Sequence, residues 1–198
     1  GIVMSSADEF ILNKMGARLV PGYTLNYKSG YDYSLKGNIS PSYRRADLHH
    51  YKIELRKLGL YGTVSNNKFV PEIYKQCSVN QKIELIQGLM DTDGYCRSGS
   101  LSFTTVSKQL AEDMQELIRS IGGIASIRTH VPKYTYRGVK KDGQLAYIVA
   151  IRYKNPASLV SLPRKQKLVD SYQYSDKLKL KISKVEYIGE KDAQCIKI

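Results

Sequence analysis

The sequence has no run of about 18 apolar residues, which is the length that a membrane-spanning helix requires. Its start also lacks the basic residues and the apolar stretch of a secretory signal, although a processed chain would lack them as well. The three cysteines are too few and too widely spaced for a disulfide framework or a Cys-x-x-Cys metal site. These absences argue against a membrane or disulfide-stapled protein and favour an intracellular one.

Histidine is equally scarce, with only His49, His50 and His130 in the chain. No cysteine-rich or acidic segment accompanies them, so they do not form the pattern of a zinc site or an HNH nuclease. We expect ordinary surface or core positions for all three.

Acidic residues are in deficit, because 18 Asp and Glu stand against 31 Lys and Arg and leave a net charge of +13. Such an excess attracts polyanions, and nucleic acid is the natural partner. A membrane surface, an acidic protein and a generally basic soluble protein stay open as alternatives. The length of 198 residues suits one large domain or two small ones.

Two parts of the chain resemble each other at an offset of 100 residues. Residues 2–12 and 102–112 each have the pattern of a short strand that runs into a helix. Alternating, strand-like segments follow each helix, and each block ends in a helix-like segment. These expected elements are strands 23–28, 31–36, 124–128 and 145–152, a helix at 107–121, and closing helices at 44–58 and roughly 156–170. The pattern predicts an α+β fold of two pseudo-twofold-related units, although any α+β domain shows some similarity of this kind.

The most informative segment begins at Ser78. Ser78 and Gln81 form a capping box, and the helix that starts there is expected to end at Gly94. Apolar residues occupy much of its circumference, which predicts a buried helix. Gly88 and Thr92, four positions apart, form a shallow strip. Because an interior glycine costs a helix about 1 kcal/mol, we expect another helix to approach closely there.

Two carboxylates, Asp91 and Asp93, stand at the C-terminal end of this helix, where the helix dipole disfavours negative charge. A metal ion would resolve the conflict. Mg²⁺ binds one or two carboxylates together with water and phosphate oxygens, which suits phosphodiester hydrolysis. A plain Asp-Gly turn is the alternative. An EF-hand loop is excluded because the twelfth position from Asp91 is Ser102 and not glutamate.

The segment Ile86–Gly94, IQGLMDTDG, resembles the motif of LAGLIDADG homing endonucleases, and the residues up to Ala125 resemble their intein-borne branch. The resemblance implies two pseudo-twofold-related αββαββα repeats that form a saddle over the DNA major groove. Each repeat delivers the last acid of its motif helix to Mg²⁺. In this chain it implies an incomplete first repeat at 1–77 that lacks its motif helix, and a second repeat at 78–170 with motif helix 79–93. Residues 171–198 would be a linker and strands that lead back to a splicing domain.

The same resemblance implies roles for individual residues. Asp93 would be the catalytic metal ligand, the carbonyl of Thr92 would join it, and Asp91 would mainly end the helix. Lys68, within Asn67–Pro71, resembles a lysine that reaches the active site in inteins. It would polarise the attacking water or stabilise the developing phosphorane charge, unless it is a solvated loop residue. A second such lysine is expected, but Lys140 and Lys141 match it only loosely. Gln87 departs from the small residue of the family motif.

Polar residues on the alternating strands and in the segment 130–144 predict a DNA-binding surface, since two-stranded ribbons can read base edges and basic loops can bind phosphates. Polar strand faces for solubility alone are the alternative. The candidates are Asn26, Lys28, Lys36, Arg128, Lys133, Arg137, Lys140, Lys141 and Arg152.

The function predicted from these residues and the resemblance is sequence-specific, Mg²⁺-dependent cleavage of double-stranded DNA in the cytoplasm, at the nucleoid or in a phage-infected cell. The second motif helix and its acid must come from a missing N-terminal segment or from another chain, and without them the enzyme would be inactive. Two alternatives stay open. One is a maturase- or regulator-like member that binds DNA or RNA without cutting, and the other is a passive intein insertion.

Overall fold

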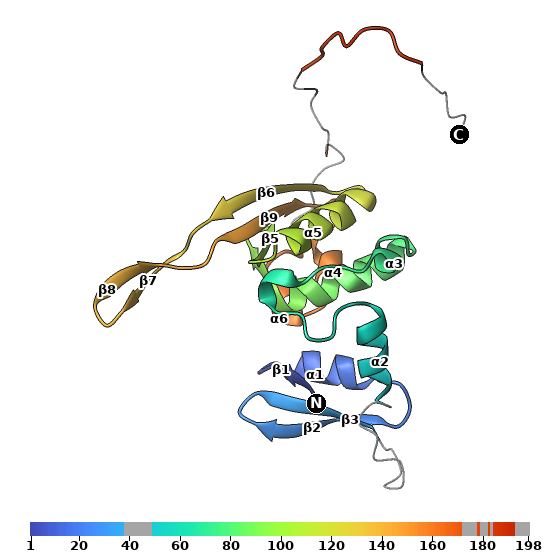
Figure 1. Ribbon diagram of the computed structural model, residues 1–198, viewed down its shortest axis with the longest axis vertical. Helices are drawn as coiled ribbons and strands as arrows, with labels where there is room; N and C mark the ends of the chain where they lie inside the picture. Colours follow the sequence, from blue (N-terminus) through green and yellow to red (C-terminus); the bar gives the residue numbers. More distant parts are fainter. Residues whose placement is uncertain (38–48, 172–177, 179–181, 183, 193–198) are drawn as a thin grey trace.

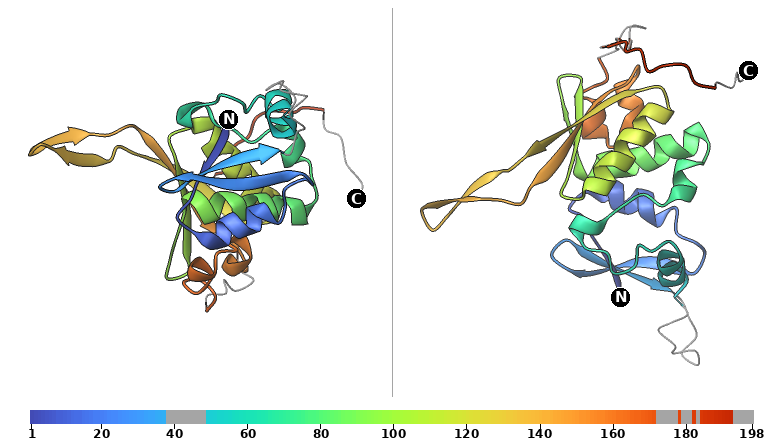
Figure 2. Two further views of the ribbon diagram at one scale, coloured as in Figure 1. Left: turned by 90° about the horizontal axis from the view of Figure 1, so that it is seen from below. Right: turned by 45° about the horizontal axis from the view of Figure 1, so that its top comes forward.

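The computed structural model describes residues 1–37, 49–171, 178, 182 and 184–192. The chain has the expected α+β fold, in which helices lie between a three-stranded and a four-stranded antiparallel sheet (Figure 1, Figure 2). Among the described residues, no helix is both long and apolar enough to span a membrane.

The C-terminal unit, residues 78–170, contains the four-stranded sheet, whose strand order is β4-β5-β9-β6. Helices α4 and α5 cover its inner face, where alternate residues such as Leu101, Phe103, Val149 and Ile151 are buried. The elements are α4 (Val79–Asp93), β4 (Gly94–Arg97), β5 (Ser100–Thr105), α5 (Lys108–Ser120), β6 (Ile124–His130) and β9 (Ala146–Arg152).

Helix α4 begins and ends where the sequence predicts. Ser78 accepts a hydrogen bond from the amide of Gln81, and the side chain of Gln81 binds back to the Ser78 amide, which confirms the capping box. Ile86 and Met90 are fully buried in the main core. The helix is therefore a core element of the C-terminal unit, as the apolar pattern indicated.

The N-terminal unit contains the three-stranded sheet, in the order β1-β3-β2. This order reproduces β5-β9-β6 of the C-terminal unit, and the described residues 1–37 and 49–77 include no equivalent of α4 and β4. Leu35 is the one core residue of this unit that is buried among those described, and neither of its helices buries a residue. The elements are β1 (Ile2–Ser5), α1 (Glu9–Gly16), β2 (Tyr23–Ser29), β3 (Asp32–Gly37) and α2 (His50–Lys57).

The segment between the units packs on the C-terminal unit. It contains a 3-10 turn, η2 (Ser65–Asn67), and a short helix, α3 (Glu72–Lys75). Val70, which lies between them, is 6% exposed and belongs to the main core. This segment is therefore structurally part of the C-terminal unit.

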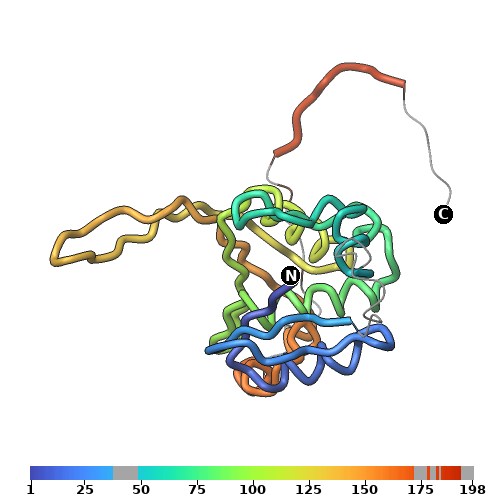
Figure 3. The backbone as a smooth tube through the Cα atoms, turned by 60° about the horizontal axis from the view of Figure 1, so that its bottom comes forward, coloured from blue at the N-terminus to red at the C-terminus, as the bar shows by residue number. Residues whose placement is uncertain are grey.

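A two-stranded sheet projects from the body between β6 and β9 (Figures 1 to 3). Strands β7 (Lys133–Tyr136) and β8 (Val139–Asp142) are joined by Arg137 and Gly138, which both have positive φ, as in a tight hairpin turn. Every residue of the two strands is exposed. The predicted basic linker is thus an extended arm.

Three predictions of secondary structure need correction or limits. A closing helix at 156–170 is wrong, because only η3 (Pro156–Leu159) and α6 (Pro163–Gln166) form there. Pro163 disfavours helical geometry at Leu162, whose φ and ψ are −69° and 117°. The part before His49 of the helix predicted at 44–58 lies outside the described residues. Most of residues 171–183 and all of residues 193–198 also lie outside them. Residues 184–192, for which strands were predicted, form no helix or strand.

Candidate active site and nucleic-acid interface

Asp93 is the last residue of α4 and is exposed. With Asp91 and Thr92 it lines a hollow of about 480 Å³, whose other walls come from the chain before α1 and from Arg164. Arg164 donates through Nε to Asp8 Oδ2 at 3.1 Å and so closes one side of the hollow. An exposed carboxylate thus stands at the end of a helix that buries one face in the core, beside a space large enough for a hydrated ion or a phosphate group.

Asp91 does more than end the helix. It is 4% exposed, and its Oδ1 accepts from the backbone amides of Ser161 at 2.9 Å and Leu162 at 3.0 Å. Its Oδ2 accepts from the hydroxyl of Ser161 and lies 3.8 Å from Lys14 Nζ. These bonds satisfy both oxygens, so Asp91 anchors α4 to the chain that follows β9 and is not available as a metal ligand.

Lys165 is a site residue that sequence reasoning missed. Its ammonium donates to the backbone carbonyls of Met90 at 2.6 Å, Asp91 at 2.8 Å and Gly94 at 2.6 Å. A cation at the C-terminal end of a helix offsets the dipole and binds carbonyls that have no partner within the helix. Lys165 is only 6% exposed, and this burial lowers the pKa of its side chain. Lys165 therefore helps to explain how two carboxylates are tolerated at this helix end.

Helix α1 packs against α4 through polar groups. Lys14 Nζ lies 3.5 Å from the side-chain oxygen of Gln87 and also binds the Ser161 hydroxyl. Gln87 in turn donates to the carbonyl of Ser158 at 2.9 Å. The glutamine that departs from the family motif is thus used in a contact between the two units.

The strip of Gly88 and Thr92 is open in the described chain. A side chain at Gly88 would meet nothing within 4 Å. The hydroxyl of Thr92 turns back to the carbonyls of Gly88 at 3.1 Å and Leu89 at 3.2 Å. Close approach of a second helix at this strip stays a prediction.

Lys68 lies on the segment that packs on the C-terminal unit. Its side chain is exposed, and with Leu85 and Leu89 of α4 it lines an apolar hollow of about 290 Å³. Within the described part of the chain, no ion pair joins Lys68 to Asp93. Its catalytic role is untested by these contacts. Lys140 and Lys141 lie on the β7–β8 arm, away from α4 (Figure 3), whereas Lys165 binds the end of α4 directly.

The residues at the helix end fit a magnesium site with one protein carboxylate. Mg²⁺ is commonly held by one or two carboxylates and completes its shell with water and phosphate oxygens. Asp93 provides such a carboxylate, and Lys165 binds the carbonyls of residues 90, 91 and 94 but not that of Thr92. No cluster of three or more His, Cys, Asp or Glu side chains that could hold a metal exists within the described ranges. A second acid from another segment or chain stays a prediction.

The predicted DNA-binding residues fall on three surfaces. Asn26 and Lys36 are exposed on the outer face of the three-stranded sheet, and Lys28 follows them at a bulge near the end of β2. Arg128 and Arg152 are exposed on the outer face of the four-stranded sheet. Lys133, Arg137, Lys140 and Lys141 are exposed on the arm. Because α1 and α4 lie between the two sheets, a single saddle over both stays a prediction (Figure 1).

The arm holds two of its cations against an aromatic ring. Arg137 lies over the ring of Tyr136, with its Cζ 5.3 Å from the ring centroid, and Lys141 Nζ lies 5.1 Å from the same centroid. Both cations are thus held beside one exposed aromatic ring. Alternating tyrosines among basic residues were the available sequence signal.

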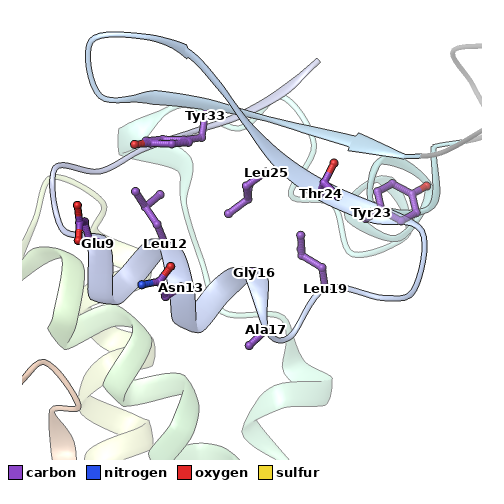
Figure 4. Close-up of a pocket in the computed structure, with 10 residues that line it drawn as sticks. All are labelled: Glu9, Leu12, Asn13, Gly16, Ala17, Leu19, Tyr23, Thr24, Leu25 and Tyr33. Atoms are coloured by element: carbon purple, nitrogen blue, oxygen red, sulfur yellow. The ribbon is translucent and has the colours of Figure 1, made fainter.

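The inner face of the three-stranded sheet is hollow beside α1 (Figure 4). The cavity has a volume of about 590 Å³ and is lined by Leu12 and Leu19 on one side and by Leu25 and Tyr33 on the other. In the C-terminal unit two helices fill the corresponding space. The N-terminal unit therefore presents an incompletely covered apolar face.

Comparison with known proteins bears on this arrangement. Residues 80–160 match the family of LAGLIDADG-like domains. A replicative DNA helicase DnaB from Mycobacterium intracellulare is 32% identical over 112 residues, which make up 56% of this chain and 18% of the helicase. The chain thus spans less than a fifth of that relative.

Solved structures of the homing endonuclease I-DmoI also resemble the chain. Its complex with DNA and Ca is 14% identical, with a TM-score of 0.44 over 86% of this chain and 82% of that one. A variant bound to its target DNA in the presence of Mg is 15% identical, with a TM-score of 0.42 over 87% and 80%. The family match covers helix α4 and the whole four-stranded sheet, including the motif that ends in Asp93. Residues 80–160 are therefore similar to LAGLIDADG-like domains, the family that the motif at the end of α4 resembles.

Proposed function

We propose that this chain is the DNA-cleaving part of an intein carried by a DnaB helicase, and that it hydrolyses phosphodiester bonds of double-stranded DNA with Mg²⁺. The observation that carries the proposal is the placement of Asp93, an exposed carboxylate on a helix that buries one face in the core and whose end is fixed by Asp91 and Lys165. The net charge of +13 and the basic outer strands supply the attraction for DNA. A helicase host also supports the cytoplasmic location.

The two units are proposed to be the two repeats of this family. The shared strand order β1-β3-β2 and β5-β9-β6 supports a duplication in which residues 1–77 form the first repeat and 78–170 the second. The first lacks its motif helix in this chain. The cavity beside α1 and the open strip at Gly88 both suit an additional helix. That helix would bring the second acid from a preceding segment or from another chain.

The chemistry divides among residues with different tasks. Mg²⁺, when bound, neutralises phosphate charge and makes a bound water a better nucleophile. Asp93 would hold it, with the carbonyl of Thr92 beside it. Asp91 and Lys165 keep the helix end in place, because the buried acid accepts three protein hydrogen bonds and the ammonium donates three. Lys68 would stabilise the charge that develops on the phosphate.

Cleavage of a plasmid that carries an uninterrupted DnaB gene, by this chain together with the segment or chain that supplies the second motif helix, tests the function. The expected result is a double-strand break at one site that requires Mg²⁺ and is lost in Asp93→Asn, while DNA affinity stays within about threefold because the neutral isostere leaves the basic surfaces unchanged. Salt-sensitive binding without cleavage would instead identify a DNA-binding member of the family. Absence of both binding and cleavage would indicate a passive insertion.

A further inference from the structure

The segment that carries Lys68 is tied to helix α5 at two points. The hydroxyl of Ser107 donates to the backbone carbonyl of Lys68 at 2.6 Å. Two residues further on, Asp113 Oδ2 accepts from the backbone amide of Val70 at 2.7 Å. Ser107 is 0% exposed and Asp113 is 1% exposed, so neither bond competes with bulk water. The backbone on both sides of Lys68 is therefore held by buried side chains.

Asp113 is itself held in one orientation. Its Oδ1 accepts from Gln109 Nε2 at 2.9 Å and lies 2.8 Å from Lys75 Nζ. Hydrogen bonds to Asp113 and Glu116 raise the pKa of Lys75, which keeps its charge at any ordinary pH. A buried carboxylate with a paired cation and two further donors is costly to disturb, because removal of one partner leaves the others unsatisfied. This makes Asp113 a rigid support.

Ser107, which holds the Lys68 backbone, lies near the end of α4 that carries Asp93. Gly94, directly after Asp93, pairs with Phe103 across the sheet, and Ser107 follows only four residues later. The N-terminus of α5, to which Lys68 is tied, thus lies at the same end of α4 as Asp93. Leu89, one helical turn before Asp93, lines the same apolar hollow as Lys68. Lys68 is presented near the reacting phosphate only if this backbone stays in place.

We propose that Asp113, together with Ser107, is a positioning residue that fixes the backbone of Lys68 so that its amine reaches the phosphate held at Asp93. The inference rests on the proposed function, in which Lys68 stabilises the phosphate charge. Asp113 does not touch DNA. Asp113 holds the backbone through the Val70 amide, and it affects the cleavage rate only by positioning Lys68.

A double-mutant cycle on single-turnover cleavage of the DnaB plasmid tests the proposal. Asp113→Asn, Lys68→Ala and the double variant are compared with the wild-type chain. Asparagine has one carbonyl oxygen, so it cannot bind Val70 on one side and both Gln109 and Lys75 on the other. We expect Asp113→Asn to lower the cleavage rate about 10- to 100-fold, the effect of a small misplacement of a catalytic group. The affinity for DNA should change less than about twofold. When Asp113→Asn is added to Lys68→Ala, the cleavage rate should fall by less than a further factor of about two.

A matched control is Glu116→Gln. Glu116 lies on the same helix and binds the same Lys75 at 2.9 Å, but its side chain is 55% exposed and its bond goes to Lys75 and not, like those of Ser107 and Asp113, to the backbone of Lys68 or Val70. Its cleavage rate should equal that of the wild type. If circular dichroism shows that Asp113→Asn does not fold, Ser107→Ala replaces it in the double-mutant cycle. Ser107→Ala removes the hydroxyl that binds the carbonyl of Lys68, so its loss in cleavage rate should also vanish in the Lys68→Ala background.

The outcomes separate the inference from the function on which it rests. An inactive wild-type chain, or a Lys68→Ala variant as fast as the wild type, overturns the proposed role of Lys68 and the inference with it. If Lys68→Ala is slow but Asp113→Asn is not, or if the two losses multiply, only the inference fails. Non-additive losses with a silent Glu116→Gln support it.

Discussion

The two units share a strand order but differ in what covers their sheets. The four-stranded sheet buries Phe103 and Val149 beneath α4 and α5, and almost the whole main core belongs to this unit. The three-stranded sheet has α1 beside a cavity of about 590 Å³ and buries Leu35. The same topology is therefore well packed where a motif helix is present and poorly packed where it is not.

The comparison shows what the motif helix contributes besides its acid. It supplies Ile86 and Met90 to the core, and its C-terminal turn ties the chain after β9 to the sheet through Asp91 and Lys165. An equivalent helix would do both for the N-terminal unit. Stability should accordingly be concentrated in the C-terminal unit, and the following substitutions test this by pairing similar residues from the two units.

The largest difference is expected for phenylalanine. Phe103 is 1% exposed in the C-terminal unit, and Phe10 on α1 is 39% exposed. Phe103→Ala should lower the free energy of unfolding by about 3 to 5 kcal/mol, because it leaves a cavity in a packed core. Phe10→Ala should cost less than about 1 kcal/mol. Urea denaturation followed by circular dichroism measures both, and equal losses would contradict the packing difference.

A smaller difference is expected for the two lysines at the end of α4. Lys165→Met leaves three carbonyls without their donor and should lower the free energy of unfolding by about 2 to 3 kcal/mol. Lys14→Met removes a partly exposed cation 3.8 Å from Asp91 and should cost about 1 kcal/mol or less. Thermal and urea unfolding of both variants is the measurement. A larger loss for Lys14 would mean that the contact between the units, and not the helix cap, holds this end of α4.

The two helix caps provide the next pair. Ser78→Ala breaks the capping box of α4 and should cost about 1 kcal/mol in global unfolding. Asp8 caps α1 through the amide of Phe10, but α1 buries no residue. Asp8→Ala should therefore change global stability by less than about 0.5 kcal/mol and appear mainly as faster amide exchange in α1. Hydrogen exchange with residue resolution checks this, and slow exchange throughout α1 in the variant would refute it.

Local signals explain which elements the sequence predicted correctly. The capping box at Ser78 and the apolar positions of α4 are contained within about four helical turns, and the strands of both sheets alternate because one face packs inward. The helix predicted at 156–170 is wrong although the sequence holds a local signal against it, because Pro163 disfavours helical geometry at Leu162. Elements with a strong local pattern were thus predictable, and their boundaries were nearly right.

The support of the candidate site was not predictable, because its partners are distant in the sequence. Lys165 binds carbonyls 71 to 75 positions away, and Asp91 is held by amides 70 and 71 positions away. No periodicity encodes such contacts. The motif predicted Asp93 as the key acid, but the resemblance to a family, and not residue spacing alone, led to it. The role of Asp91 as an anchor became visible only in three dimensions.

The smallest effect on stability is expected in the projecting arm. Tyr136 on β7 is 51% exposed and packs against Arg137 and Lys141, whereas Tyr31, between β2 and β3, is 68% exposed. Either tyrosine replaced by alanine should change the free energy of unfolding by less than about 0.5 kcal/mol, since neither lies in a core. Tyr136→Ala should nevertheless weaken DNA binding about three- to fivefold if Arg137 and Lys141 bind phosphates as proposed, because the ring that orders both cations is gone. Fluorescence anisotropy with a duplex at fixed salt measures this. An equal loss for Tyr31→Ala would show that exposed aromatic area, and not the ordered cations of the arm, accounts for the affinity.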